Sequence, residues 1–294
     1  MRFLPSQEIM KNDFYKYQAQ TTPHPLAIEI SHAKGCYIYD IKGKEYLDFI
    51  AGVSASSLGH CHPKVISAVK NQLDKYLHVM VYGEFIQEPA VELTKLLSGL
   101  LPDNLTTTYL TNSGTEAIEG SMKLARRATG RKEIIYSKKA YHGNTMGALS
   151  IMGVEERKKI FQPLLPNCNS IEFNNEKDIL KITSKTAGVV LETIQGGAGF
   201  IVPKNDYLRK VKNRCSAVGA LLILDEIQPG FGRTGKLFGF EHYDISPDIL
   251  AIGKGMGGGM PIGAFTASKK LMSLLSNNPK LGHITTFGGH PVIA

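Results

Sequence analysis

Two short apolar runs, each followed closely by a charged residue, constrain most strongly what this chain can fold into. The runs cover residues 221–224 (LLIL) and 249–252 (ILAI); Asp225 follows the first directly, and Lys254 follows the second after one glycine. Continuous aliphatic runs of this length are typical of strands buried in an α/β sheet. Ligands of such sheets bind just beyond the carboxyl ends of the strands. The sequence therefore predicts that the Asp225 carboxylate and the Lys254 amine converge on one crevice.

The surroundings of Lys254 suit a lysine that reacts with a carbonyl ligand. Glycines at 253, 255 and 257–259 leave the lysine free of neighbouring side chains, so a planar ligand can approach the amine. Such chemistry needs an acid that keeps a pyridine nitrogen protonated, and Asp225 fits that role. We therefore interpret Lys254 and Asp225 as candidate catalytic residues.

The sequence around these two residues resembles a known family. The runs DEIQPGFGRTGKLFGFEHY (225–243) and PDILAIGKGMGGGMPIG (247–263) closely resemble the class III aminotransferases, which are pyridoxal-phosphate enzymes of the aspartate-aminotransferase fold (fold type I). The resemblance implies that Lys254 carries the cofactor, that Asp225 pairs with its pyridine nitrogen, and that Gln228 lies by its phenolic oxygen. It also implies an α/β fold with a mostly parallel sheet flanked by helices.

A second motif, SGTE at residues 113–116, predicts a phosphate site at the start of a helix. Ser113 and Glu116 fit a capping box that opens a helix running through Arg127. The apolar face of this helix is Ile118, Met122 and Ala125. With Gly114 at its mouth, the helix offers free N–H groups and the positive end of a dipole to an anion, although an ordinary capped helix fits the spacing equally well. Resemblance to the family's N-S-G-T-E-A implies that Ser113, Gly114 and Thr115 hold the cofactor phosphate.

Other parts of the resemblance supply further candidate cofactor-binding residues. Tyr141 is suited to stacking on a pyridine ring, and Tyr141-His142-Gly143 resembles the family's aromatic-His-Gly. Glu192 ends a predicted strand, 189–192, as in the family's E-P-I-Q-G, although Thr193 replaces the proline.

Two positions depart from the family pattern. Asn144 stands where many class III enzymes of acidic substrates have an arginine, and Gly197 stands where ornithine-type members have a gating acid. The acid–arginine switch of those members therefore cannot be carried over to this chain.

The C-terminal segment HITTFGGHPVIA resembles the family's S-T-[YF]-G-G-N-P. In the family, the threonine of this motif reaches the phosphate of the neighbouring subunit; Thr286 is the match, which implies a homodimer. Class III enzymes continue beyond this point into a C-terminal small domain, which we expect to be absent from this chain. We expect residues 1–53 to form an N-terminal arm and small-domain strands, and residues 54–294 to form the large cofactor-binding domain.

Local patterns predict the elements of the N-terminal part. Residues 34–52 alternate apolar and polar side chains on either side of Lys42-Gly43, which is a hairpin signal. Pro63 begins a predicted helix with Val65, Val69, Leu73 and Tyr76 on one face.

Composition and the first residues indicate the compartment. The start MRFLPSQEIMKNDFYKYQ lacks the apolar core of a signal peptide, and no apolar run approaches the roughly 20 residues of a spanning helix. The four cysteines have no paired spacing, which is typical of thiols in a reducing compartment. We expect a cytoplasmic protein without a membrane partner.

Four rival interpretations are disfavoured. The net charge of +8 is scattered without a basic block, so nucleic acid is not an expected partner. His60-Cys61-His62 lacks the second cluster that a zinc site needs, so no metal is expected. Residues 253–258 match G-x-G-x-x-G, but no acid follows and Pro261 interrupts the helix. Residues 230–236 have phosphate-loop spacing, but Leu237 cannot hold magnesium, so this loop is interpreted as a structural turn with Arg233 bonding backbone carbonyls.

The predicted function is pyridoxal-phosphate-dependent transamination. The expected donor is an ω-amino compound such as acetylornithine, ornithine or 4-aminobutyrate, and the expected acceptor is a 2-oxo acid such as 2-oxoglutarate. Two alternatives remain open: other chemistry of the same cofactor (decarboxylation, racemisation or internal amino transfer), or an inactive fragment that only binds cofactor or a partner subunit.

Overall fold

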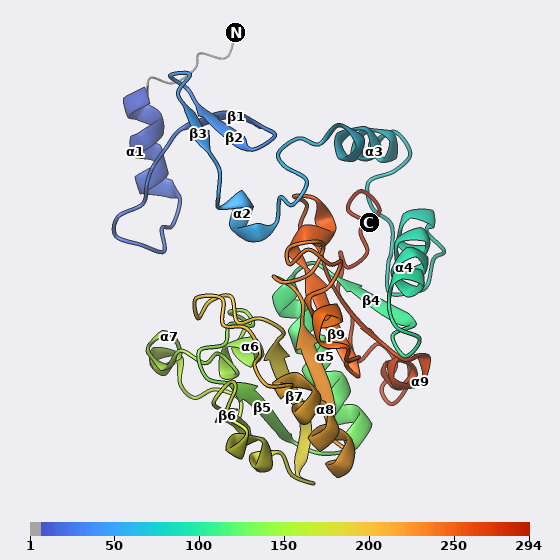
Figure 1. Cartoon of the computed structure of the whole chain (residues 1–294). Helices are drawn as coiled ribbons and strands as arrows, with labels where there is room; N and C mark the ends of the chain where they lie inside the picture. The colour runs from blue at the N-terminus through green and yellow to red at the C-terminus, as the bar shows by residue number, and fades with distance from the viewer. Residues whose placement is uncertain (1–6) are drawn as a thin grey trace.

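The computed structural model describes residues 7–294. The expected N-terminal arm and the absence of a signal peptide rest partly on residues 1–6, which lie outside this range. Within it, none of the helices combines the length and apolar character needed to cross a membrane. Figure 1 shows a small sheet with α1 (Gln7–Tyr17) at one end of the molecule and a large sheet flanked by helices at the other.

The N-terminal part is built on a three-stranded antiparallel sheet. Its elements are α1 (Gln7–Tyr17), β1 (Ile30–Lys34), β2 (Tyr37–Asp40), β3 (Glu45–Leu47) and α2 (Ala51–Ser54). The hairpin predicted around Lys42-Gly43 is confirmed, because β2 pairs with β3 across this turn. Asp40 stabilises the turn by accepting hydrogen bonds from the backbone N–H groups of Lys42 and Lys44.

α2 is a left-handed turn. The φ angles of Ala51, Gly52, Val53 and Ser54 lie between 50° and 64°, a region that costs residues other than glycine about 1 kcal/mol or more each. Asp48 caps the turn by accepting from the backbone N–H groups of Ile50 and Ala51.

Helices α3 and α4 connect the small sheet to the large one. They are α3 (Pro63–Leu73) and α4 (Glu88–Leu100). The helix predicted from Pro63 is confirmed, although it ends at Leu73, so that Tyr76 lies beyond it. His60 next to this helix hydrogen-bonds Asp48 through Nε2 at 2.7 Å. Among residues 7–294, no group of three or more His, Cys, Asp or Glu side chains is arranged to hold a metal.

The rest of the chain forms a seven-stranded sheet with helices on both faces. In chain order its elements are β4 (Thr107–Thr111), α5 (Gly114–Thr129), β5 (Glu133–Ser137), α6 (Met146–Ser150), α7 (Glu155–Lys158), η1 (Lys159–Phe161), β6 (Cys168–Ile171), η2 (Lys177–Lys181), β7 (Thr186–Glu192), α8 (Tyr207–Val218), β8 (Leu221–Asp225), η3 (Gly239–Tyr243), β9 (Ile249–Gly253), η4 (Lys254–Gly257), β10 (Gly263–Ala267), α9 (Lys269–Met272) and η5 (Ser273–Leu275), where η marks a 3₁₀ helix. The strand order is β4-β10-β9-β8-β7-β5-β6.

The sheet is mostly parallel, as predicted. Strands β6, β5, β7, β8 and β9 pair in parallel, and β10 runs antiparallel between β9 and β4. The two apolar runs of the sequence are the centre of this sheet, since β8 and β9 are neighbours and almost entirely buried.

Side chains of the central strands alternate between two hydrophobic clusters, one on each face. Leu222 and Leu224 of β8 belong to the cluster that α8 covers, whereas Ile223 belongs to the cluster that α5 covers. Figure 1 shows these two helices on opposite faces of the sheet. The predicted apolar face of α5 (Ile118, Met122 and Ala125) is buried, as expected. α5 also lies so close to β10 that a Cβ on Gly120 would be 2.3 Å from the ring of Phe265.

Candidate active site

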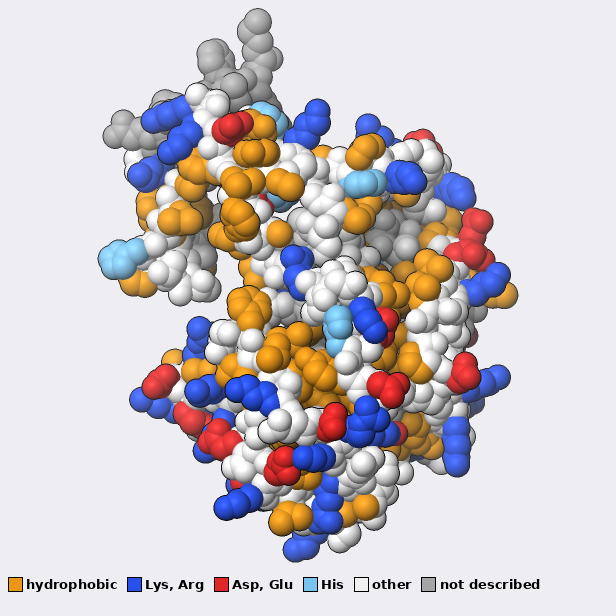
Figure 2. Space-filling view, viewed as in Figure 1, with side chains coloured by type: hydrophobic (Ala, Val, Ile, Leu, Met, Phe, Trp, Pro, Cys, Tyr) orange, Lys and Arg blue, Asp and Glu red, His pale blue; other side chains and the backbone are white. Residues whose placement is uncertain are grey.

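A cavity of about 510 Å³ opens at the carboxyl ends of β7, β8 and β9, between these strands and α2. Figure 1 shows α2 beside the loops that leave this end of the large sheet. Figure 2 shows the molecule hollowed between the small sheet and the body below it. The residues that line the cavity are Val53, Gly114, Thr115, Tyr141, His142, Gly143, Asn144, Glu192, Gly196, Gly197, Asp225, Ile227, Gln228 and Lys254. The convergence of Asp225 and Lys254 that the strand pattern predicts is therefore present.

Asp225 is held in place by two donors. Its Oδ2 lies 2.7 Å from Nδ1 of His142, and its Oδ1 accepts from the backbone N–H of Ile227 at 3.0 Å. Burial by itself would lower the pKa of His142, but the hydrogen bond and the charge of Asp225, with a smaller contribution from Glu192, raise that pKa above its usual value. An imidazole that donates to Asp225 fixes the orientation of the carboxylate at the cavity.

Lys254 enters the cavity from a strained turn at the end of β9. Its φ of 46° is in the left-handed region, which a lysine adopts only at a cost of about 1 kcal/mol or more. The preceding Gly253 is extended, and a Cβ there would lie 3.2 Å from the Ile262 carbonyl oxygen. The turn thus changes the chain direction at the point where the amine reaches the crevice.

The N-terminus of α5 forms one wall of the cavity. Ser113 is the N-cap, and its Oγ accepts from the backbone N–H of Glu116. The predicted capping box is only half correct: the Glu116 carboxylate accepts from the backbone N–H of Asn112, at 2.7 Å, instead of that of Ser113. Gly114 approaches Ile227 so closely that a Cβ would lie 2.8 Å from its side chain. This close approach brings the first backbone N–H groups of α5 to the cavity.

The loop after β5 supplies the opposite wall. The Tyr141 ring is 37% exposed and lines the cavity, and its hydroxyl accepts from Nδ2 of Asn144 at 3.1 Å. Gly143 packs on the start of α5, because a Cβ there would lie 2.1 Å from Oγ1 of Thr115. Thr115 and Thr145 also share a hydrogen bond of 2.9 Å. The loop is therefore fixed relative to the helix N-terminus.

Gln228 lies on the third side of the cavity. Its Nε2 donates to Oγ of Ser54, at 3.2 Å, and so connects the strand-end loop to α2. Arg233, expected to bond backbone carbonyls, donates to the Ser54 carbonyl oxygen and to Oγ of Ser57. The loop 230–236 thus contacts the segment 54–57, which includes the end of α2.

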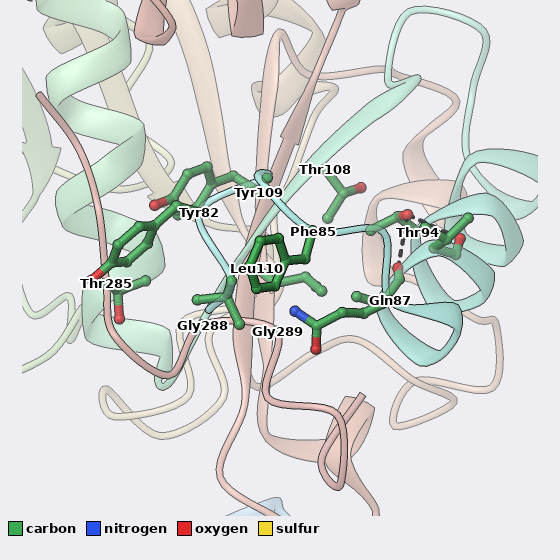
Figure 3. Close-up of a pocket in the computed structure, with 14 residues that line it drawn as sticks. Tyr82, Phe85, Gln87, Thr94, Thr108, Tyr109, Leu110, Thr285, Gly288 and Gly289 are labelled. Carbon is green, nitrogen blue, oxygen red and sulfur yellow. Dashed lines mark hydrogen bonds between the residues drawn. The ribbon is translucent and has the colours of Figure 1, made fainter. Parts of the chain in front are cut away.

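Thr286 does not line this cavity within its own chain. Its neighbour Thr285 instead lines a second cavity, of about 260 Å³, along the edge strand β4. Figure 3 shows the side chains of Tyr82 and Phe85 around this second cavity, together with Gln87. Thr285 is also bonded to the Asn112 side chain, at 2.6 Å, just before α5.

Several residues that line the first cavity were missed by reasoning from the sequence. Val53, Gly196 and Ile227 carry no reactive group, so no chemical motif marks them. Val53 reaches the cavity through the left-handed turn, and Gly196 through a close approach to Gln228. Of these three residues, only Ile227 could have been found from the sequence, because it lies two residues after Asp225.

Comparison with known proteins places this arrangement in a family. The pattern of the family described as Aminotransferase class-III matches residues 17–294. The chain belongs to the class-III aminotransferases. Members of this family depend on pyridoxal phosphate, and their fold is the one described above.

Individual relatives are similar over almost the whole chain. The acetylornithine aminotransferase of Clostridium acetobutylicum is 41% identical over 272 residues, which are 90% of this chain and 68% of that enzyme. A putative [LysW]-aminoadipate semialdehyde/glutamate semialdehyde transaminase of Pyrococcus abyssi is 42% identical over 267 residues, covering 90% of this chain and 70% of its own. The crystal structure of ornithine aminotransferase from Toxoplasma gondii superposes with a TM-score of 0.90 at 31% identity, covering 99% of this chain and 69% of the other.

The cavity of this class-III aminotransferase fits pyridoxal phosphate. The N-terminus of α5, the buried carboxylate of Asp225 on a central strand and a lysine amine line the same space. The buried Nε2 of His142 has no hydrogen-bond partner among the described residues. These observations agree with a planar, phosphate-bearing ligand that carries a ring nitrogen and an aldehyde.

Proposed function

We propose that this class-III aminotransferase transfers the amino group of an ω-amino compound, of the acetylornithine, ornithine or 4-aminobutyrate kind, to a 2-oxo acid such as 2-oxoglutarate. The observation that carries the proposal is the placement of Asp225 and Lys254 at the ends of neighbouring strands, in one cavity with the N-terminus of α5. Relatives named acetylornithine aminotransferase support the choice of donor.

The roles of the site residues are also part of this proposal. We assign the cofactor phosphate to Ser113, Gly114 and Thr115. The ring nitrogen is assigned to Asp225 and the ring face to Tyr141. The remaining residues assigned to the cofactor site are His142, Glu192 and Gln228. Asp225 holds the proton on the ring nitrogen, since hydrogen bonds from His142 and the Ile227 N–H keep its carboxylate in place. The phosphate is held by backbone N–H groups and the helix dipole.

Lys254 is proposed to move the proton. When bound, pyridoxal phosphate supplies an electron sink for the charge left on the substrate carbon. The Nζ atom of Lys254 would hold the cofactor between turnovers, and the freed amine would take the proton from the substrate carbon and release it again in the same half-reaction. The flanking glycines let the turn that carries Lys254 pack closely, since a Cβ on Gly255 would lie 2.7 Å from Ser57 Oγ.

The wall formed by Tyr141 and Asn144 bears on the choice of substrate. Among the described residues that line the cavity there is no arginine, and Lys254 is committed to the reaction. The Tyr141 hydroxyl and the Asn144 amide offer hydrogen bonds without charge. The Gly197 backbone lies directly beside Tyr141, because a Cβ on Gly197 would be in van der Waals contact with the Tyr141 Cβ at 3.5 Å.

A panel of amino donors tests the proposed reaction. We expect kcat/KM for acetylornithine, ornithine or 4-aminobutyrate to exceed that for alanine by at least about 100-fold, since a site built to bind a polar group rejects an analogue that lacks it. The measurement is keto-acid formation with and without 2-oxoglutarate. Equal turnover of donors with and without an ω-amine would refute the substrate assignment. Product formation without any 2-oxo acid would favour decarboxylation, racemisation or internal amino transfer.

A homodimer is proposed as the active assembly, with Thr286 reaching the neighbouring subunit's phosphate. Thr286 does not line the cavity of its own chain, and its neighbour Thr285 lines the second cavity (Figure 3). Large apolar side chains are exposed near this cavity: Leu77, Val79, Met80, Phe85 and Ile86. The buried Oε1 of Gln87, which also lines it, has no partner within the described residues. A second copy of the chain would cover these groups.

Substitution of Ile86 with lysine tests the dimer. Ile86 is 95% exposed in the single chain, and burying an isoleucine is worth about 1.5–3 kcal/mol. Because a symmetric interface loses two such side chains, Ile86→Lys is expected to raise the dimer dissociation constant at least about 100-fold. Ile160→Lys is the control, since Ile160 is 74% exposed beside α7, far from α4 in Figure 1. The measurement is size-exclusion chromatography with light scattering. A wild-type monomer with full cofactor affinity would contradict the proposal.

A further inference from the structure

Glu192 is a buried carboxylate at the centre of the cavity. It ends β7, lies in register with Asp225 of β8, and is 4% exposed. Neither proton transfer by Lys254 nor the anchoring of the ring nitrogen by Asp225 uses it. A buried carboxylate has a high desolvation cost, so its contacts indicate what it contributes.

The carboxylate connects two separate loops. Its Oε2 accepts from the backbone N–H of Tyr141, and its Oε1 accepts from the backbone N–H of Gly196, both at 3.1 Å. Tyr141 lies in the loop after β5, whereas Gly196 lies in the loop after β7. Each oxygen therefore holds one wall of the cavity.

The bond to Gly196 also bears on Gln228. A Cβ on Gly196 would lie 1.8 Å from Oε1 of Gln228, so the Gly196 backbone rests directly against that carboxamide. Gln228 is held from its other side by Ser54. A shift of Gly196 would therefore change the position of Gln228.

We infer that Glu192 is a positioning residue that sets the spacing between the Tyr141 ring and the Gln228 carboxamide by tying both loops to the end of β7. This inference rests on the proposed use of the cavity as the cofactor site. Glu192 acts through Tyr141 and Gly196, and it does not touch the reacting atoms. The predicted consequence is that the grip on the cofactor ring depends on an intact, ionised Glu192.

The charge state of Glu192 makes its two hydrogen bonds to the loops dependent on pH. Burial raises the pKa of Glu192 to about 7; the charge of His142 opposes this rise and that of Asp225 adds to it. Lys254 lines the same cavity from the end of β9. Protonation turns one acceptor oxygen into a hydroxyl, which weakens one of the two bonds. Because the pKa of Glu192 is raised above its usual value of 4.5, Glu192 stabilises the folded protein fully below pH 4.5, and this stabilisation is lost as the pH rises through about 7.

The two loops are held most firmly above about pH 7, where Glu192 is ionised and both its oxygens accept hydrogen bonds. At that pH the buried charge lowers the free energy of unfolding.

Hydrogen exchange of the cofactor-free protein tests the inference directly. In Glu192→Gln, the side-chain NH₂ cannot accept from a backbone N–H, so one of the two bonds is lost. We expect amide exchange in the segments containing Tyr141 and Gly196 to become about 10-fold faster or more, since hydrogen bonds to charged groups contribute about 1.5–3 kcal/mol. Unchanged exchange in both segments would overturn the inference.

Glu226→Gln is the matched control. Glu226 is equally buried and also has a pKa raised by burial to about 7, but it accepts from the backbone N–H groups of Gly239 and Phe240 and from Thr193 Oγ1. We expect faster exchange around Gly239 and unchanged exchange at Tyr141.

If Glu192→Gln does not fold, wild-type protection factors replace it: protection of Tyr141 and Gly196 should rise as the pH passes about 7, and constant protection would contradict the inference.

Cofactor affinity provides a second measurement. We expect affinity for pyridoxal phosphate to rise as the pH passes through about 7 in the wild type and in Glu226→Gln, and this step to be absent in Glu192→Gln. A step that persists in Glu192→Gln would overturn the inference. Failure of the wild type to bind pyridoxal phosphate at all would instead refute the proposed function, while the exchange experiment would still decide whether Glu192 ties the loops together.

Discussion

Replacement of Lys254 with alanine is expected to lower the rate of amino transfer by at least about 10⁴-fold, the upper end of what general acid–base catalysis alone contributes. The expectation is this large because we assign both the covalent attachment and the proton transfer to Lys254. No other lysine lines the cavity among the described residues. The measurement is keto-acid formation by the purified variant with saturating pyridoxal phosphate.

Lys236→Ala is the matched control for this substitution. Lys236 is an exposed lysine in a glycine-rich loop, and its Nζ donates to the Glu241 carbonyl oxygen. We expect its rate to stay within about two-fold of the wild type, as for most surface substitutions. A Lys254→Ala variant that retained more than about 1% of the wild-type rate would show that another group moves the proton.

The second large effect is expected for Asp225→Asn, which should lower kcat by about 10²–10³-fold, the typical loss when one preorganised electrostatic contact is removed. Asparagine keeps the shape of the side chain but removes the charge to which we assign the stabilisation of a protonated ring nitrogen. The carboxylate is buried and bonded to His142 Nδ1, so water cannot replace its charge. Because we assign the phosphate contacts to α5, the loss should appear more in kcat than in cofactor affinity.

Asp248→Asn controls for the loss of a partly buried carboxylate on the same sheet. Asp248 accepts from the Leu222 backbone N–H and from Lys212 Nζ, at the opposite end of β8 from Asp225. We expect its kcat to be within a few-fold of the wild type, because the site is remote. Equal losses of kcat in Asp225→Asn and Asp248→Asn would indicate general destabilisation in place of a specific role for Asp225.

The sheet and its two charged strand ends could be predicted from the sequence because their signals are local. Continuous aliphatic runs indicate burial on both faces, and β8 and β9 are buried as expected. The position of Asp225 and Lys254 follows from the shared carboxyl edge of parallel strands. The buried face of α5 follows equally from its helical spacing.

Other features depend on contacts that the sequence pattern does not encode. The carboxylate of Glu116 is held by Asn112, which donates to it from both its backbone N–H and its side-chain Nδ2. The left-handed turn at Ala51–Ser54 and its Val53 side chain depend on tertiary packing that overrides local preference. The bonds from Glu192 to two loops likewise join segments separated by about fifty residues of chain.

Mass spectrometry of the protein reduced with borohydride after incubation with pyridoxal phosphate tests the central claim most directly. The account predicts that the pyridoxyl-phosphate mass is fixed on the peptide that contains Lys254, and that Lys254→Ala loses this label while Lys236→Ala keeps it. A label spread over exposed lysines, or one that persists in Lys254→Ala, would contradict the assignment of Lys254 and of the cavity at the ends of β8 and β9.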